Sequence, residues 1–237
     1  RPMQLLLSNS TMPGEPYFRF AAGKIAEAFR DGPREWLFVP FAGVTITLDE
    51  YTRRVSEGLA AHGMTARGLH TCADPIKAIA EAEAIAIGGG NTFRLLERLH
   101  ALALLDPIRE RAAAGVPIAG WSAGANVCGP SLKTTNDMPI IEPASFDALG
   151  LAPFQINPHY TQRTLDGHGG ESRDQRLAEF LVLNPEMPVA CLPEGSALHL
   201  RADDVTVDGR LKVLRGGEDP AEYVSGARLT RELRPAG

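Results

Sequence analysis

Ser122 lies at the centre of Gly-Trp-Ser-Ala-Gly, residues 120–124, directly after a short apolar run. The spacing G-x-S-x-G between a strand and a helix is typical of a nucleophile elbow, a sharp turn that projects a serine hydroxyl. Side chains two residues before and after the serine would collide in such a turn, so glycine is expected at both places. The first N–H of the following helix, that of Ala123, would point to where an oxyanion forms.

A serine becomes a nucleophile when a neighbouring base takes its proton. Among the six histidines, His159 is the best candidate because it ends the strand-like run 154–159. If that strand runs parallel to the one before Ser122, both residues lie at the same edge of the sheet. His168 lies in a glycine-rich stretch and is predicted to be exposed. The remaining histidines are predicted to be structural or to face solvent: His62, His70, His100 and His199.

The base in turn needs a carboxylate that orients its imidazole. Two acids compete for this role. Glu194 follows the strand-like run 188–193, and Asp137 lies in the polar loop after the elbow helix. Either carboxylate could accept a hydrogen bond from the ring N–H, and the residues alone leave both possibilities open.

A second glycine-rich stretch, residues 87–96, reads Ile-Gly-Gly-Gly-Asn-Thr-Phe-Arg-Leu-Leu. One interpretation is a phosphate cradle at a helix N-terminus. The dinucleotide fingerprint fails, however, because Phe93 stands where its last glycine belongs, and the Lys-Ser/Thr of a Walker motif is missing. The interpretation favoured beside Ser122 is the second half of an oxyanion hole, formed by a backbone N–H of Gly89 or Gly90.

Positioning these side chains requires buried strands that alternate with helices. Apolar runs without strict polar alternation are typical of strands buried on both faces, and they occur at 3–8, 35–40, 83–88, 115–120, 154–159 and 188–193. The runs alternate with helical patterns, for which Asn91 and Ser172 are predicted N-caps. The sequence therefore predicts an α/β fold in one domain, residues 1–237, with an open, mainly parallel sheet covered by helices on both faces. Asp208-Gly209 predicts the turn of a C-terminal antiparallel hairpin.

Composition excludes several classes of protein. The net charge is −5 and no basic stripe is visible, so no nucleic-acid partner is expected. The three cysteines include no CxxC pair, which argues against a metal site or a disulfide framework and favours a reducing, cytoplasmic location. No apolar run is long enough to cross a membrane.

Several stretches together carry a resemblance to a known family. They are "LLLSNSTMPGEPY", "AIGGGNTFRLL", "AGWSAGANVCGPSLKTTNDMPI", "FDALGL", "QINPHY", "GESRDQRL" and "LPEGSAL". In order and spacing, from about residue 3 to beyond residue 200, the chain resembles the peptidase E branch of the S51 serine peptidases, the α-aspartyl dipeptidases. The resemblance implies a fold similar to class I glutamine amidotransferases and hydrolysis of dipeptides with an N-terminal aspartate, without metal or cofactor. The loop "TTNDMPI" makes the related cyanophycinases a less suitable comparison.

The resemblance also implies roles for residues. Ser122 matches the nucleophile and His159 the base, while Asp137 and Glu194 each match an acid associated with them. We expect Glu194 to orient His159, and Asp137, with Asn136 beside it, to line the substrate pocket. Arg173, at a helix start, is predicted to bind the substrate's side-chain carboxylate, which suits its planar fork.

Two other functions stay open at this point. One is an amidase or transferase on the same scaffold, although class I glutaminases have cysteine where this chain has Ser122. The other is a binding domain without catalysis. Small peptides are the expected partners, and the chain is expected to be a monomer or a homodimer.

Overall fold

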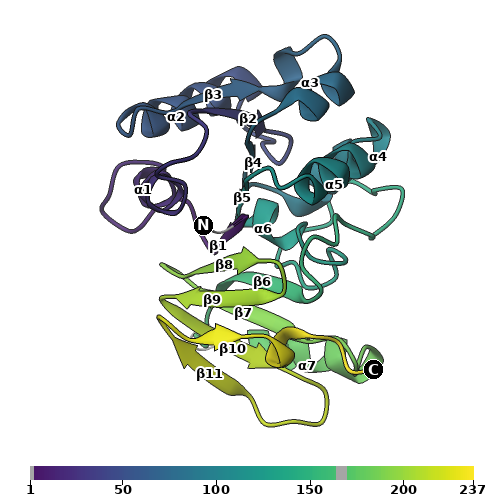
Figure 1. The fold of residues 1–237 in the computed structure, drawn as a ribbon. Helices are drawn as coiled ribbons and strands as arrows, with labels where there is room; N and C mark the ends of the chain where they lie inside the picture. The colour runs from purple at the N-terminus through teal and green to yellow at the C-terminus, as the bar shows by residue number, and fades with distance from the viewer. Residues whose placement is uncertain (1–2, 164–169) are drawn as a thin grey trace.

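The computed structural model describes residues 3–163 and 170–237 (Figure 1). Its larger sheet has eight strands in the order β12-β9-β8-β1-β5-β4-β2-β3. Five neighbouring strands run parallel: β1 (Gln4–Leu7), β5 (Ile118–Trp121), β4 (Ile85–Ile87), β2 (Glu35–Val39) and β3 (Thr65–Gly68). An antiparallel extension continues from β1 through β8 (Ala197–Arg201), β9 (Asp204–Asp208) and β12 (Arg228–Leu229). The predicted α/β class with a mainly parallel central sheet is confirmed.

Successive strand residues point to opposite sides of the sheet, so the parallel strands present apolar side chains on both faces. Helices cover both of these faces. Leu5 and Leu7 pack with α1 (Arg19–Ala28) and α2 (Leu48–Ala60), whereas Leu6 belongs to the cluster on the other face. That second face is covered by α3 (Pro75–Glu81), α4 (Thr92–Ala101) and α5 (Leu105–Ala113). Short 3-10 turns occupy Leu69–Thr71 and Arg231–Leu233.

A separate sheet of four strands lies beside the larger one (Figure 1). Its order is β11-β10-β7-β6, formed by β6 (Gln155–Tyr160), β7 (Val189–Pro193), β10 (Arg210–Leu214) and β11 (Ala221–Val224). The prediction that His159 ends a strand of the same sheet as Ser122 is therefore wrong. The apolar runs 154–159 and 188–193 do form buried strands, β6 and β7, and these are parallel as expected. They pair with each other, however, and not with β5.

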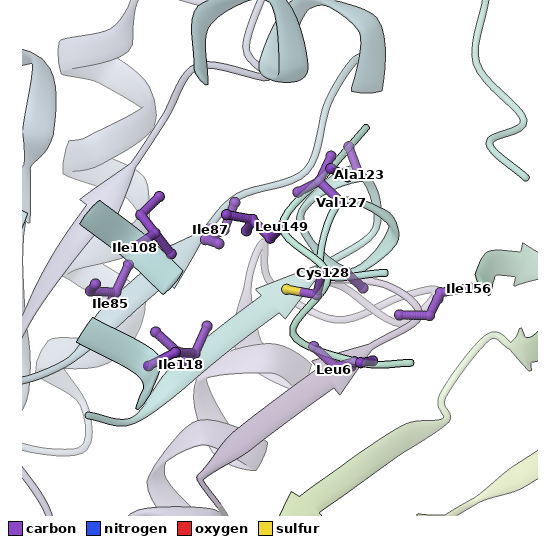
Figure 2. Close-up of a cluster of buried hydrophobic side chains, with 14 of the residues drawn as sticks. Leu6, Ile85, Ile87, Ile108, Ile118, Ala123, Val127, Cys128, Leu149 and Ile156 are labelled. Atoms are coloured by element: carbon purple, nitrogen blue, oxygen red, sulfur yellow. The ribbon is translucent and has the colours of Figure 1, made fainter. Parts of the chain in front are cut away.

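The hydrophobic core joins the two sheets. Figure 2 shows Leu6, Ile85 and Ile118 of the larger sheet in one cluster with Ile156 of β6. The same cluster includes Val127 and Cys128, which follow α6 (Ala123–Asn126), a helix in contact with both β5 and β6. The short helix after Ser122 is thus packed between the two sheets.

Two predicted helix caps are confirmed. The side chain of Asn91 accepts a hydrogen bond from the Arg94 N–H at the start of α4. Ser172 forms a capping box with Gln175 at the start of α7 (Arg173–Leu183).

The hairpin predicted at Asp208-Gly209 is wrong in its position. Consecutive strands pair antiparallel on either side of this point: β8 with β9, where Arg201 pairs with Asp204, and β10 with β11. At Gly209 the chain instead leaves the larger sheet and enters the smaller one as β10. Gly209 has φ +91°, and a Cβ there would lie 2.8 Å from the Ser196 hydroxyl, so glycine suits this close crossing.

Candidate active site

Ser122 occupies the turn between β5 and α6, with φ 55° and ψ −117°. Residues other than glycine rarely adopt this backbone conformation. The flanking glycines are required by close backbone contacts. A Cβ at Gly120 would lie 2.6 Å from the carbonyl oxygen of Gly124, and a Cβ at Gly124 would lie 2.0 Å from the carbonyl oxygen of Ile87. The sequence pattern therefore corresponds to a strained turn that holds the serine hydroxyl at the end of a central strand.

Three side chains meet at this turn in one line of hydrogen bonds. The Oγ of Ser122 lies 2.8 Å from Nε2 of His159. On the other side of the ring, Nδ1 of His159 lies 2.5 Å from Oε1 of Glu194. A hydroxyl, an imidazole and a carboxylate in this order are the arrangement that activates a serine.

A distortion of β6 aims His159 across the gap between the sheets. His159 has φ 52°, and the pairing of β6 with β7 shifts between Asn157 and Tyr160. The displaced His159 N–H donates to Oγ of Ser8, at 2.8 Å. The Ser8 hydroxyl itself donates to the Leu192 carbonyl, also at 2.8 Å. Ser8 is buried and directly follows β1, so its hydroxyl links the larger sheet to β6 and β7 of the smaller one. The sequence analysis missed this residue.

The other predicted acid lies elsewhere. Oδ2 of Asp137 accepts hydrogen bonds from the backbone N–H and the hydroxyl of Thr92, at 2.8 and 2.6 Å, at the start of α4. Its neighbour Asn136 donates to the Pro158 carbonyl at 2.7 Å and accepts from the amide of Asn157. The structure therefore brings Glu194, and not Asp137, to His159. Substrate contact by Asn136 or Asp137 stays a prediction.

Arg173 also has a partner within the protein. Its Nη1 donates to the carbonyl oxygen of His159 at 2.6 Å, and burial lowers the pKa of the half-buried guanidinium. The next residue of α7, Asp174, accepts a hydrogen bond from the hydroxyl of Tyr160 and contacts Lys212 at 3.1 Å. The start of α7 thus holds β6 at the irregular stretch through the His159 carbonyl and the Tyr160 side chain. Recognition of a substrate carboxylate by Arg173 stays a prediction.

The glycine-rich loop between β4 and α4 lies against the elbow. A Cβ at Gly89 would lie 2.8 Å from Cβ of Ser122. Gly90 has φ +143°, and a Cβ there would lie 2.1 Å from the Ala42 carbonyl oxygen. The hydroxyl of buried Tyr51 donates to the Gly89 carbonyl at 2.8 Å. Because N–H and C=O point in opposite directions in a trans peptide, this bond also fixes the direction of the Gly90 N–H.

These groups line one cleft of about 720 Å³. Ser122, His159 and Glu194 lie along it together with Gly89 and Gly90. The rest of the lining includes residues 9–11 and 42–46, Tyr17 just before α1, and Tyr51 and Arg54 of α2. The volume is suitable for a small peptide.

The comparison with known proteins agrees with this geometry. The sequence profile of Peptidase family S51 matches residues 4–207. The chain belongs to peptidase family S51. Two relatives named Peptidase E, from Citrobacter koseri and Salmonella newport, are each 46% identical over 227 residues, which is 95% of this chain and 99% of theirs. This S51 chain is accordingly a serine peptidase.

Solved structures show the same fold at low sequence identity. A putative peptidase E from Listeria monocytogenes has a TM-score of 0.67 and 21% identity, covering 86% of this S51 peptidase and 96% of that chain. A peptidase from an acI-B1 actinobacterium has a TM-score of 0.66 and 17% identity, covering 96% of both chains.

Within residues 3–163 and 170–237, no group of three or more His, Cys, Asp or Glu side chains could hold a metal ion. In that part of the chain, no helix has the length and apolar character needed to cross a membrane. His168 lies outside the described residues.

Proposed function

We propose that this S51 peptidase hydrolyses dipeptides with an N-terminal aspartate, using Ser122 as nucleophile, His159 as base and Glu194 as the acid that orients it. The observation that supports the mechanism is the unbroken line of contacts from the Ser122 hydroxyl through both ring nitrogens of His159 to the Glu194 carboxylate. The match to relatives named Peptidase E supports the substrate class.

In the first step His159 takes the proton of Ser122, whose oxygen attacks the peptide carbonyl. The resulting imidazolium is stabilised by Glu194 at Nδ1. His159 then gives the proton from Nε2 to the leaving amine, which departs as the second amino acid. Water attacks the acyl-enzyme by the reverse sequence and releases aspartate.

The oxyanion formed in each step needs donors next to Ser122. We assign this role to the N–H of Ala123, at the start of α6, and to an N–H of the Gly89–Gly90 loop, against which the Ser122 side chain packs. Loss of one such donor typically costs about 3 kcal/mol of transition-state stabilisation.

The test is the release of aspartate from Asp-Leu by the purified chain and by Ser122→Ala. Since no other group supplies the nucleophile, Ser122→Ala should reduce turnover to background while its circular dichroism and melting curve stay those of the unaltered chain. Turnover by Ser122→Ala close to that of the unaltered chain would exclude the serine mechanism.

A substrate panel tests the specificity. Asp-X dipeptides should be cleaved well, whereas Glu-X, β-aspartyl and N-blocked dipeptides and tripeptides should be cleaved slowly or not at all. Equal rates on Ala-Leu and Asp-Leu would contradict the proposed requirement for aspartate, while leaving the serine mechanism in place.

A further inference from the structure

A dipeptide with an N-terminal aspartate carries two carboxylates, and the cleft should offer at least one of them a cation. Arg173, predicted for this role, donates to the His159 carbonyl and does not line the cleft. Among the described residues that line it, Arg54 is the one Lys or Arg. We propose that Arg54 binds a carboxylate of the substrate. This inference rests on the proposed function.

The position of Arg54 follows from the helix that carries it. Arg54 lies on α2 three residues after Tyr51, and side chains at this spacing share a helix face. The hydroxyl of Tyr51 reaches the Gly89 carbonyl, and Gly89 in turn lies against Ser122. The face of α2 that supports the oxyanion loop therefore also directs the guanidinium of Arg54 to the cleft beside that loop.

The contacts of Arg54 leave its fork available. Its Nε donates to Oε1 of Glu50 at 3.1 Å, and its Cζ lies 5.7 Å from the centroid of the Tyr17 ring. In the part of the chain that the structure describes, Nη1 and Nη2 have no hydrogen-bond partner. A guanidinium held at Nε and against an aromatic ring, with both terminal nitrogens free, can bind the two oxygens of one carboxylate.

The preceding residue provides a matched control. Arg53 uses Nε and Nη2 on Glu50 and Nη1 on Glu57, so all of its nitrogens are engaged on the helix surface. Arg53 does not line the cleft. Arg53→Met and Arg54→Met remove the same charge from the same helix and from the same partner, Glu50, but only the second removes a cation from the cleft.

The experiment compares these two variants and the unaltered chain on three substrates: Asp-Leu, Asn-Leu and Asp-Leu-amide. Asn-Leu lacks the side-chain carboxylate, and Asp-Leu-amide lacks the terminal one. Arg54→Met should lower kcat/KM for Asp-Leu about 10- to 100-fold, the effect expected when a hydrogen bond between charged groups is lost. Arg53→Met should change it less than about threefold. Analogues that are cleaved too slowly are compared through their inhibition constants against Asp-Leu.

The pattern of losses identifies which carboxylate is bound. If Arg54 binds the side-chain carboxylate, Arg54→Met impairs Asp-Leu and Asp-Leu-amide but leaves Asn-Leu nearly unchanged. If it binds the terminal carboxylate, Asp-Leu and Asn-Leu are impaired and the amide is not. Equal losses on all three substrates, or equal effects of the two variants, would overturn the inference.

A binding measurement separates this inference from the proposed function. If the unaltered chain cleaves none of the dipeptides, the proposed function fails. Calorimetric titration of Asp-Leu into Ser122→Ala, with and without Arg54→Met, then still tests Arg54. A Kd weakened at least tenfold by Arg54→Met supports the carboxylate site, and an unchanged Kd rejects it.

Discussion

At the scale of single residues, the two candidate acids differ in what their carboxylates contact. Glu194 faces Nδ1 of His159, whereas Asp137 accepts two hydrogen bonds from Thr92. Glu194→Gln should therefore lower kcat by roughly two to three orders of magnitude, because an amide neither stabilises the imidazolium nor enforces the required tautomer. Steady-state kinetics on Asp-Leu measure this effect.

Asp137→Asn is the informative comparison at the same scale. It should leave kcat within a few-fold of the unaltered value and lower the free energy of unfolding by about 1 kcal/mol, because the start of α4 loses a charged acceptor. The reverse result, a large loss of kcat in Asp137→Asn and a small one in Glu194→Gln, would assign the orienting role to Asp137.

The role of a single residue could be predicted where the residues next to it in the sequence carry the pattern. Ser122 could be singled out because the turn that presents it requires glycine two residues before and two residues after it, and His159 because it ends an apolar run. The partner of His159 could not be chosen between Glu194 and Asp137, since the choice depends on which loop reaches the ring. Arg54 was missed because, in one sequence, an arginine on an amphipathic helix has the pattern of an ordinary surface residue.

At the scale of elements, the packing of α6 against β4 depends on a glycine. A methyl group at Gly124 would overlap the backbone of Ile87, with 2.0 Å between Cβ and the carbonyl oxygen. Gly124→Ala should therefore destabilise the chain by about 3 kcal/mol or more, since backbone has to move to admit the methyl group. For a chain of this length that corresponds to a decrease in Tm of about 6–12 °C.

Gly23 in α1 provides the control for that prediction. A Cβ there meets no heavy atom within 4 Å, and its backbone is helical. Gly23→Ala should keep or raise Tm, by up to about 1 kcal/mol of added stability, because alanine favours the helix. Differential scanning calorimetry of both variants is the measurement, and similar Tm values for the two would contradict the required close approach at Gly124.

Elements were predictable where their own residues carry the signal. The buried strands show continuous apolar runs, and Asn91 and Ser172 are N-caps. The strand β3, Thr65–Gly68, was missed because it lies at the edge of the sheet and only Gly68 in it is buried. The division into two sheets was also missed, since a buried strand has the same apolar pattern whichever sheet it joins. The close contacts at Gly209 explain why glycine stands at the crossing between the sheets.

At the scale of the whole molecule, the two sheets share packing and hydrogen bonds. Ile156 and Leu192 of the smaller sheet belong to the same buried cluster as Leu6 and Ile118 of the larger one. The side-chain amide of Asn126 donates to the Ile156 carbonyl at 2.8 Å, between α6 and β6. The line of contacts from Ser122 through His159 to Glu194 also joins the two sheets. We therefore expect residues 1–237 to unfold as one cooperative unit, as predicted for a single domain.

Two buried cysteines can test this expectation. Cys128 packs in the cluster between the sheets, and Cys191 lies in β7 against α7. Burial raises the pKa of Cys128 to about 12 and raises that of Cys191 as well, so both remain unreactive thiols in the folded chain near pH 8.

In a Cys72→Ser background, iodoacetamide labelling across a guanidinium titration should show one midpoint for both cysteines, equal to the midpoint from circular dichroism. Labelling of Cys191 at a clearly lower denaturant concentration than Cys128 would mean that the smaller sheet unfolds first. His159 and Glu194 would then belong to a separately unfolding part, and activity should be lost at the Cys191 midpoint while the larger sheet remains folded.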